Sequence, residues 1–180
     1  EMGGWGPIIG DEGSGYYIGV SGLRAVVKEF EGTGVKTSLT PRIMEALKKD
    51  LNKSPFEAYA TEIGMVLEEL RFILKNLDRF TRPRKVRTPV AQFLSTSRVY
   101  REPYGVVLIM SPWNYPFQLT VAPLIGAMAA GNCALVKPSA YSPHTSAVIR
   151  QMIAGNFDER YIAAVEGGRE VNQALLEKKF

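Results

Sequence analysis

Two short polar segments contain the residue types that could do chemistry. Asn114 lies within Ser-Pro-Trp-Asn-Tyr-Pro at 111–116, and Lys137 begins Lys-Pro-Ser at 137–139. A side-chain amide on a proline-braced loop could stabilise an oxyanion, and a lysine could bind ribose hydroxyls or phosphate. From spacing alone, Asn114 fits better as a loop asparagine that bonds its own backbone, and Lys137 fits equally well as a solvated lysine.

The other titratable side chains have simpler structural interpretations. Cys133 lies in the apolar run Cys-Ala-Leu-Val and is predicted to be a core residue, not a nucleophile. His144 falls in the first turn of a predicted helix, where a cation is disfavoured, so it is expected to be neutral or capping. Glu62, Glu68 and Glu69 are predicted to lie on a solvated helix face. With one Cys and one His in the chain, no metal site is predicted.

The composition is that of one globular unit with a local basic stripe. The chain has 180 residues, 46% of them hydrophobic, and a net charge of +4. The stripe has seven basic residues and no acid: Arg79, Arg82, Arg84, Lys85, Arg87, Arg98 and Arg101. Because few aromatic residues interleave with it, we expect a solvated or subunit-contacting ribbon and no nucleic-acid partner.

No membrane span or secretion signal is expected. The uncharged stretch 103–136 is interrupted by prolines and asparagines, and its longest apolar run falls short of the roughly 18 residues that a span needs. The N-terminus lacks the basic and then apolar pattern of a signal peptide. The predicted location is the cytoplasm, where a single reduced cysteine is ordinary.

The last third of the chain alternates strands with helices. Strands are predicted at 106–110, 133–136 and 161–165, each followed by a helix, and the first strand reads as buried on both faces. This order predicts an α/β fold with a partial, Rossmann-like parallel sheet. Carboxyl ends of parallel strands meet at one edge, so Asn114 and Lys137 should share that edge. The free amides that begin the helix at 117–130 could receive a phosphate.

The elements before this sheet are predicted from apolar spacing and from Gly and Pro. Ten of the 17 glycines fall in residues 1–35, with one short helix expected at 21–29. Two amphipathic helices are predicted over 43–80 and a basic hairpin over 86–102, with strands at 90–94 and 99–101. The predicted domains are a Gly-rich part, 1–42, and a second part, 43–180, whose cofactor-binding α/β unit covers 104–180.

The second part resembles the aldehyde dehydrogenase superfamily, closest to its class 3-like branch. The matching runs, in order, are Glu45-Ala-Leu-Lys-Lys-Asp-Leu-Asn-Lys-Ser, Tyr59-Ala-Thr-Glu-Ile-Gly, Glu102-Pro-Tyr-Gly-Val-Val, Ser111-Pro-Trp-Asn-Tyr-Pro-Phe, Ala127-Met-Ala-Ala-Gly-Asn and Lys137-Pro-Ser. The resemblance implies oxidation of a small-molecule aldehyde to a carboxylic acid with NAD or NADP. It implies that Asn114 stabilises the oxyanion. It assigns cofactor contacts to Ser111, Pro112, Trp113, Lys137 and Ser139.

Departures from the family pattern limit what this chain is expected to do. The family's catalytic cysteine and general-base glutamate match positions beyond Phe180, so little turnover is expected from the chain alone. The family commonly has glutamate where this chain has Ala140, and its absence predicts tolerance of NADP as well as NAD. A family-type homo-oligomer is expected to have an incomplete pairing surface. The alternative is a non-catalytic nucleotide-binding or interaction fragment.

Residues 2–42 resemble a different family, the BadF-type ATPases and N-acetylglucosamine kinase-like proteins. The resemblance rests on Gly4-Trp5-Gly6-Pro-Ile-Ile-Gly-Asp-Glu-Gly-Ser-Gly-Tyr-Tyr-Ile-Gly and on Leu23-Arg24-Ala25. It implies that Asp11 and Glu12 could accept hydrogen bonds from sugar hydroxyls. Because the two resemblances meet between residues 39 and 44, the sequence predicts a chimera, either a natural fusion or a misassembled reading frame. A piece of a sugar kinase or ATPase is a further alternative.

Overall fold

The computed structural model describes residues 39–180, so the glycine-rich segment and the helix predicted at 21–29 lie outside the described residues. The helices are α2 (Leu39–Leu51), α3 (Pro55–Ala58), a π-helical turn (Tyr59–Ile63), α4 (Gly64–Thr81), α5 (Gln118–Ala129), α6 (Pro143–Asn156) and α7 (Arg169–Leu176). The strands are β1 (Arg84–Val86), β2 (Ser97–Val99), β3 (Val106–Met110), β4 (Cys133–Lys137) and β5 (Ile162–Ala164).

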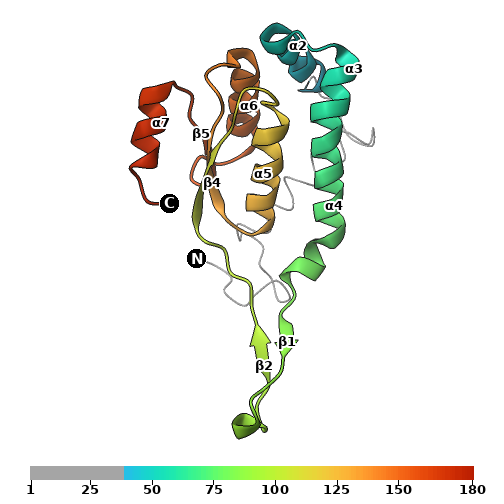
Figure 1. The fold of residues 1–180 in the computed structure, drawn as a ribbon, viewed down its shortest axis with the longest axis vertical. Helices are drawn as coiled ribbons and strands as arrows, with labels where there is room; N and C mark the ends of the chain where they lie inside the picture. Colours follow the sequence, from blue (N-terminus) through green and yellow to red (C-terminus); the bar gives the residue numbers. More distant parts are fainter. Residues whose placement is uncertain (1–38) are drawn as a thin grey trace.

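A parallel sheet of order β3-β4-β5 confirms the predicted α/β class. In register, Val106 lies opposite Cys133 and Met110 lies opposite Lys137. Helices α5 and α6 connect the strands and cover one face, and α7 lies on the other side (Figure 1). The prediction that the first strand is buried on both faces is wrong at its ends. Val106 and Met110 are exposed, because β3 is an edge strand of the described sheet.

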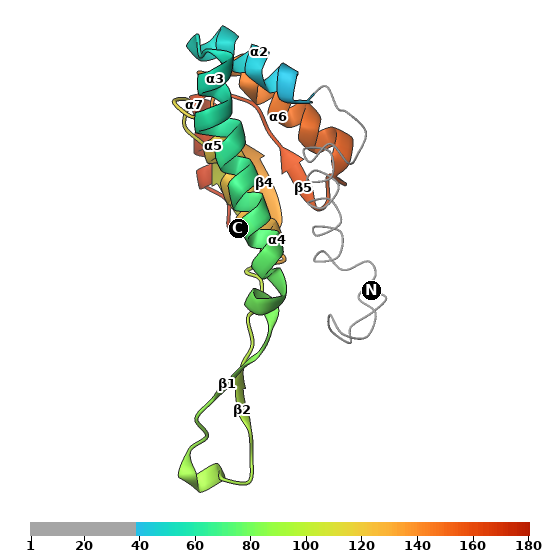
Figure 2. The same cartoon turned by 90° about the vertical axis from the view of Figure 1, so that its right-hand side faces the viewer.

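A second helical layer covers α5 and α6. Helix α2 packs on α6, and the long helix α4 packs on α5 (Figure 2). The apolar stripe predicted for the helix at 55–80 faces this interface, and its buried members are Ile63, Val66, Leu67, Leu70, Ile73 and Leu77. Burying each large aliphatic side chain contributes about 1.5–3 kcal/mol, so this stripe fixes the outer layer onto the sheet domain.

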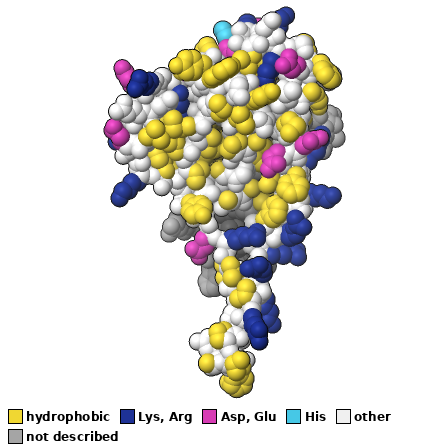
Figure 3. Space-filling model, viewed as in Figure 1, with side chains coloured by type: hydrophobic (Ala, Val, Ile, Leu, Met, Phe, Trp, Pro, Cys, Tyr) yellow, Lys and Arg dark blue, Asp and Glu magenta, His cyan; other side chains and the backbone are white. Residues whose placement is uncertain are grey.

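The basic hairpin projects away from this body (Figures 1 and 2). Strands β1 and β2 pair antiparallel, with Arg84 opposite Val99. The strand predicted at 90–94 is wrong, because Val90–Gln92 is a 3₁₀ turn in which the Gln92 amide donates to the Pro89 carbonyl. Basic side chains line the shaft (Figure 3). The tip exposes three large hydrophobic residues: Val90, Phe93 and Leu94.

Candidate functional site

The two segments singled out in the sequence meet at the carboxyl edge of the sheet. Ser111 follows β3, Lys137 ends β4, and the Ser111 amide donates a 3.2 Å hydrogen bond to the Lys137 carbonyl. The expectation that both segments line one edge is therefore confirmed. Ligands of open α/β sheets bind at such edges.

The loop after β3 presents its polar tip to solvent. From its residue type alone, Trp113 is predicted to be a packing residue, and this prediction is wrong because Trp113 is 53% exposed. Pro112 is also exposed. The Asn114 side chain is exposed and makes no hydrogen bond within residues 39–180, so it does not bond its own backbone. Its two N–H donors are available to a ligand.

The base of the same loop is held by two hydroxyl groups. Thr120 Oγ1 donates to the Pro116 carbonyl at 2.5 Å and lies 2.5 Å from Ser111 Oγ. Thr120 is fully buried in α5, so the hydroxyl pair is fixed to the helix core. The Ser111 hydroxyl is therefore bonded at the base of the loop and does not lie at the exposed tip.

Lys137 is buried, in contrast to the solvated lysine that its spacing allowed. Its side chain is 3% exposed, and within the described residues its ammonium donates only to the Pro138 carbonyl, at 2.9 Å. Burial lowers the pKa of the Lys137 ammonium below its ordinary value. An ammonium has three donors, so the geometry leaves two for a ligand.

The residues after Lys137 form a tight, hydrogen-bonded turn into α6. Ser139 is buried, and its Oγ accepts a 3.2 Å hydrogen bond from the Tyr141 amide. The Ser139 carbonyl accepts from Ser146 Oγ at 2.7 Å. Ala140 is exposed beside this turn. The turn is held by these hydrogen bonds, and an uncharged side chain faces solvent at Ala140.

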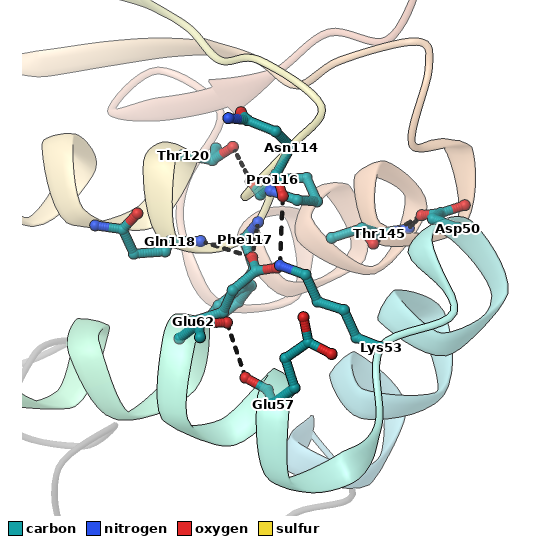
Figure 4. A network of polar contacts seen from close by, with 11 residues as sticks. Asp50, Lys53, Glu57, Glu62, Asn114, Pro116, Phe117, Gln118, Thr120 and Thr145 are labelled. Atoms are coloured by element: carbon teal, nitrogen blue, oxygen red, sulfur yellow. Dashed lines mark hydrogen bonds and ion pairs between the residues drawn. The ribbon is translucent and has the colours of Figure 1, made fainter.

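A buried ion pair behind the loop was missed by sequence reasoning. Lys53 is 7% exposed, Glu62 is 0% exposed, and Lys53 Nζ lies 2.5 Å from Glu62 Oε1. Lys53 Nζ also donates to the Asn114 carbonyl at 3.3 Å and lies 4.1 Å from the centre of the Tyr115 ring (Figure 4). The prediction that Glu62 lies on a solvated face is wrong, although Glu68 is exposed and Glu69 is half-buried.

A signal for Glu62 was present in the spacing. It lies four residues before Val66 and eight before Leu70, on the apolar stripe itself. It also falls within the π-helical turn, which is a feature frequent at functional sites. Lys53 follows Asn52, whose φ of 54° turns the chain out of α2. A charged residue at a core position of the stripe therefore indicates a buried group that needs a partner of opposite charge.

Both helices that follow the site segments have carboxylates at their N-termini. Glu62 Oε2 accepts from the Phe117 amide at 2.8 Å and from the Gln118 amide at 3.2 Å. Asp50 accepts from the His144 amide at 3.1 Å and from the Thr145 amide at 2.7 Å. The predicted phosphate site at the start of the 117–130 helix is therefore wrong, because carboxylate oxygens already occupy those amides.

Cys133 and His144 stand apart from the site edge. Cys133 begins β4, at the opposite end of the strand from Lys137, and is half-buried against the core. The His144 side chain is exposed, and its backbone amide is capped by Asp50. Residues 39–180 contain no cluster of three metal-ligating side chains. Within the same range, every helix is too short or too polar to cross a membrane.

The fold is thus an α/β domain whose parallel sheet places a buried lysine and an unengaged amide at its carboxyl edge, where ligands of such sheets bind. The chain belongs to the aldehyde dehydrogenase family, whose model matches residues 38–179. The 4,4'-diaponeurosporen-aldehyde dehydrogenase of Staphylococcus aureus is 48% identical over 138 residues, covering 77% of this chain and 30% of that protein. The Bos taurus aldehyde dehydrogenase family 3 member B1 is 42% identical over 138 residues, with the same coverages, which confirms the class 3 likeness.

Solved structures agree with this assignment. The substrate-bound state of Staphylococcus aureus AldH matches with a TM-score of 0.82 and 42% identity, over 89% of this chain and 34% of that chain. The fold is shared by a Streptococcus pyogenes succinic semialdehyde dehydrogenase in complex with NADP⁺ and by a Mycobacterium tuberculosis aldehyde dehydrogenase complexed with NAD⁺, with TM-scores of 0.75 and 0.73. Of these two solved structures, one therefore contains NADP⁺ and the other NAD⁺. The chain spans about a third of the length of the relatives that it matches.

Proposed function

We propose that this chain supplies the nucleotide-binding part and the oxyanion-binding amide for the NAD(P)-dependent oxidation of an aldehyde to a carboxylic acid. The observation that carries the proposal is the buried Lys137 ammonium at the same sheet edge as the unengaged Asn114 amide. Bound NAD(P)⁺ would accept a hydride in this reaction. The chain's own residues would bind and orient the reacting groups.

Asn114 is the proposed oxyanion donor. Its exposed amide has both N–H groups free, and a fixed donor aimed at a developing oxyanion contributes about 10²–10³ in rate. Ser111, Pro112 and Trp113 would border the nicotinamide, because they share the loop that carries Asn114. The neutral amide suits a negatively charged oxygen without adding a group that titrates near neutral pH.

Lys137 and Ser139 are the proposed contacts to the cofactor's ribose. The Lys137 ammonium has one backbone acceptor in a buried setting, and ribose hydroxyls would supply the acceptors that it lacks. The cofactor phosphates would not sit at the N-termini of α5 or α6, because Glu62 and Asp50 occupy those amides. The fit of this site to NAD(P) therefore rests on the contacts proposed to the ribose.

Ala140 supports use of NADP as well as NAD. It is exposed immediately after Ser139, and a glutamate there would repel a 2′-phosphate. The chain should bind both cofactors with similar affinity, and Ala140→Glu should weaken NADP binding much more than NAD binding. A strong preference of the unchanged chain for NAD would contradict this proposal.

The chain alone is proposed to bind cofactor without turning over aldehyde. The reaction needs a nucleophilic thiolate, and the one cysteine of the sequence, Cys133, begins β4. Lys137 lies four positions further along the strand, a span of about 13 Å. A non-catalytic nucleotide-binding fragment is therefore the alternative that this placement favours for the chain in isolation.

Calorimetric titration of the 180-residue chain with NAD and with NADP tests the proposal. Lys137→Met should abolish measurable binding, whereas Lys75→Met, which changes a lysine on the outward side of α4, should leave it unchanged. No binding by the unchanged chain, or equal binding by both variants, would contradict the proposal. Aldehyde oxidation that Cys133→Ser abolishes would contradict the assignment of Cys133 to the core.

Two further proposals concern segments outside this site. Self-association would use the hairpin tip, where Phe93 is 76% exposed. Sedimentation velocity of Phe93→Asp should then show a smaller species than the unchanged chain.

For residues 2–42, the BadF-type resemblance stays a proposal from sequence. ATP binding that Asp11→Ala abolishes and Lys137→Met leaves intact would support it. A cytoplasmic location also stays a prediction.

A further inference from the structure

We infer that Lys53 and Glu62 are positioning residues that hold the loop after β3 so that the Asn114 amide faces the site. This inference rests on the proposed function of Asn114. Neither residue touches the exposed face of the loop, so neither is proposed to contact substrate or cofactor (Figure 4).

The contacts of the pair are concentrated on one short segment. Lys53 Nζ bonds the Asn114 carbonyl at 3.3 Å and lies 4.1 Å from the centre of the Tyr115 ring. Glu62 Oε2 bonds the amides of Phe117 and Gln118. Two side chains from the outer helical layer therefore fix the segment from 114 to 118 from behind.

Asn114 depends on this pair more than Ser111 and Pro116, at the ends of the loop, do. The bond from Lys53 is the only hydrogen bond that Asn114 makes within residues 39–180. Ser111 is tied to β4 through the Lys137 carbonyl, and Pro116 is tied to α5 through Thr120. The loop is anchored at both ends by the sheet domain, and the pair holds its middle.

The cost of burying two charges argues for a positional role. A buried ion pair is often matched or exceeded in stability by apolar residues of similar volume, because both ions must be desolvated. The contacts of this pair differ in kind: a cation holds a carbonyl and a ring, and an anion holds two amides. Apolar side chains could fill the space but could not fix these backbone groups.

A double variant can separate loop position from stability. In a Trp5→Phe background, Trp113 is the one remaining tryptophan, so its fluorescence anisotropy and acrylamide quenching report on the loop without any cofactor. Lys53→Met and Glu62→Gln should each destabilise the chain, because a single change leaves the pair unbalanced in a buried setting. The decisive variant is the double change Lys53→Met/Glu62→Gln, which leaves no charge. The introduced glutamine amide can still accept from the two backbone amides, but the Asn114 carbonyl loses its donor.

We expect the double variant to recover the melting temperature lost in the single variants. Trp113 should nonetheless be more mobile and more quenched than in the unchanged loop, and NAD(P) should bind on the order of tenfold more weakly. The matched control is Glu45→Gln/Lys49→Met, which removes an exposed pair on α2 with an N–O distance of 2.7 Å and should change none of these readouts.

Each other outcome overturns the inference. A stable double variant with unchanged Trp113 mobility would make the pair a packing feature, and a double variant that does not fold would make it a folding requirement. Failure of the unchanged chain to bind NAD(P) is a different result. It would contradict the proposed function, whereas the Trp113 readouts would still decide the role of the pair.

Discussion

Glu62 and Phe117, 55 positions apart in the chain, are joined by a 2.8 Å hydrogen bond from the Phe117 amide to the Glu62 carboxylate. Asp50 and Thr145 repeat this relationship at the next helix, with a 2.7 Å bond from the Thr145 amide. A carboxylate from the outer helical layer thus caps each helix that follows a site segment. The layer formed by α2 and α4 therefore orients the sheet edge as well as covering the core.

Asp50→Ala should loosen α2 from α6. The change removes two backbone hydrogen bonds at the start of α6 and the 2.7 Å bond from Thr145 Oγ1, so we expect a loss of about 1–2 kcal/mol of unfolding free energy. Urea denaturation followed by circular dichroism measures it. Asp50→Asn keeps an acceptor and should lose less. Equal stabilities of the alanine variant and the unchanged chain would show that the cap does not fix the layer.

Gly64→Ala should destabilise a helix that alanine normally favours. A Cβ at Gly64 would lie 3.0 Å from the Tyr59 carbonyl oxygen, within the π-helical turn that carries Glu62. In a regular helix the same change gains up to about 1 kcal/mol. The matched control is Gly126→Ala in α5, where nothing lies within 4 Å of the added Cβ. Thermal unfolding of both variants measures the difference, and equal stabilisation would show that the turn adapts.

The fold was largely predictable because its apolar periods are regular. The stripe that includes Leu70 and Leu77 correctly predicted the inward face of α4. The short apolar run at β4 correctly predicted a strand of the sheet. The hairpin strand at 90–94 was misassigned because Pro89 was interpreted as the sign of an edge strand, whereas it begins a turn. The exposure of β3 depends on its edge position, which local sequence does not encode.

The site was predictable only for the residues that follow the strands. Asn114 and Lys137 follow strands, and the rule for parallel sheets places them at one edge. The supporting half lies more than fifty positions earlier than the loop: Lys53 follows α2 in the connection to α3, and Glu62 lies in the π-helical turn. Glu62 was assigned to solvent because single charges on amphipathic helices are usually solvated. The burial of Lys137 escaped prediction for the same reason, since it is decided by tertiary packing.

Tyr161→Phe should reduce the fall in unfolding free energy that the unchanged chain shows at alkaline pH. The Tyr161 hydroxyl is buried without a hydrogen-bond partner within the described residues, and burial, with a smaller effect from Cys133, raises the Tyr161 pKa to about 12. Between about pH 10 and 12 the unfolded chain releases the proton and the folded chain retains it, so unfolding free energy falls as pH rises. Chemical denaturation at several pH values should show a shallower fall for Tyr161→Phe. Tyr141→Phe, at an exposed tyrosine, should keep the slope of the unchanged chain.

Lys137→Met should stabilise the chain while abolishing the proposed ribose contact. The ammonium is buried with one carbonyl acceptor, and burial lowers its pKa below the ordinary value of 10.5. Between the folded pKa and 10.5 the unfolded chain binds more protons, so the unfolding free energy of the unchanged chain rises with pH. Lys137→Met should remove that rise and gain about 1 kcal/mol near neutral pH. Denaturant titrations from neutral to alkaline pH, with Lys75→Met as the control, measure both effects. A less stable Lys137→Met with the alkaline rise intact would show that the ammonium stabilises the fold and is not held for a ligand.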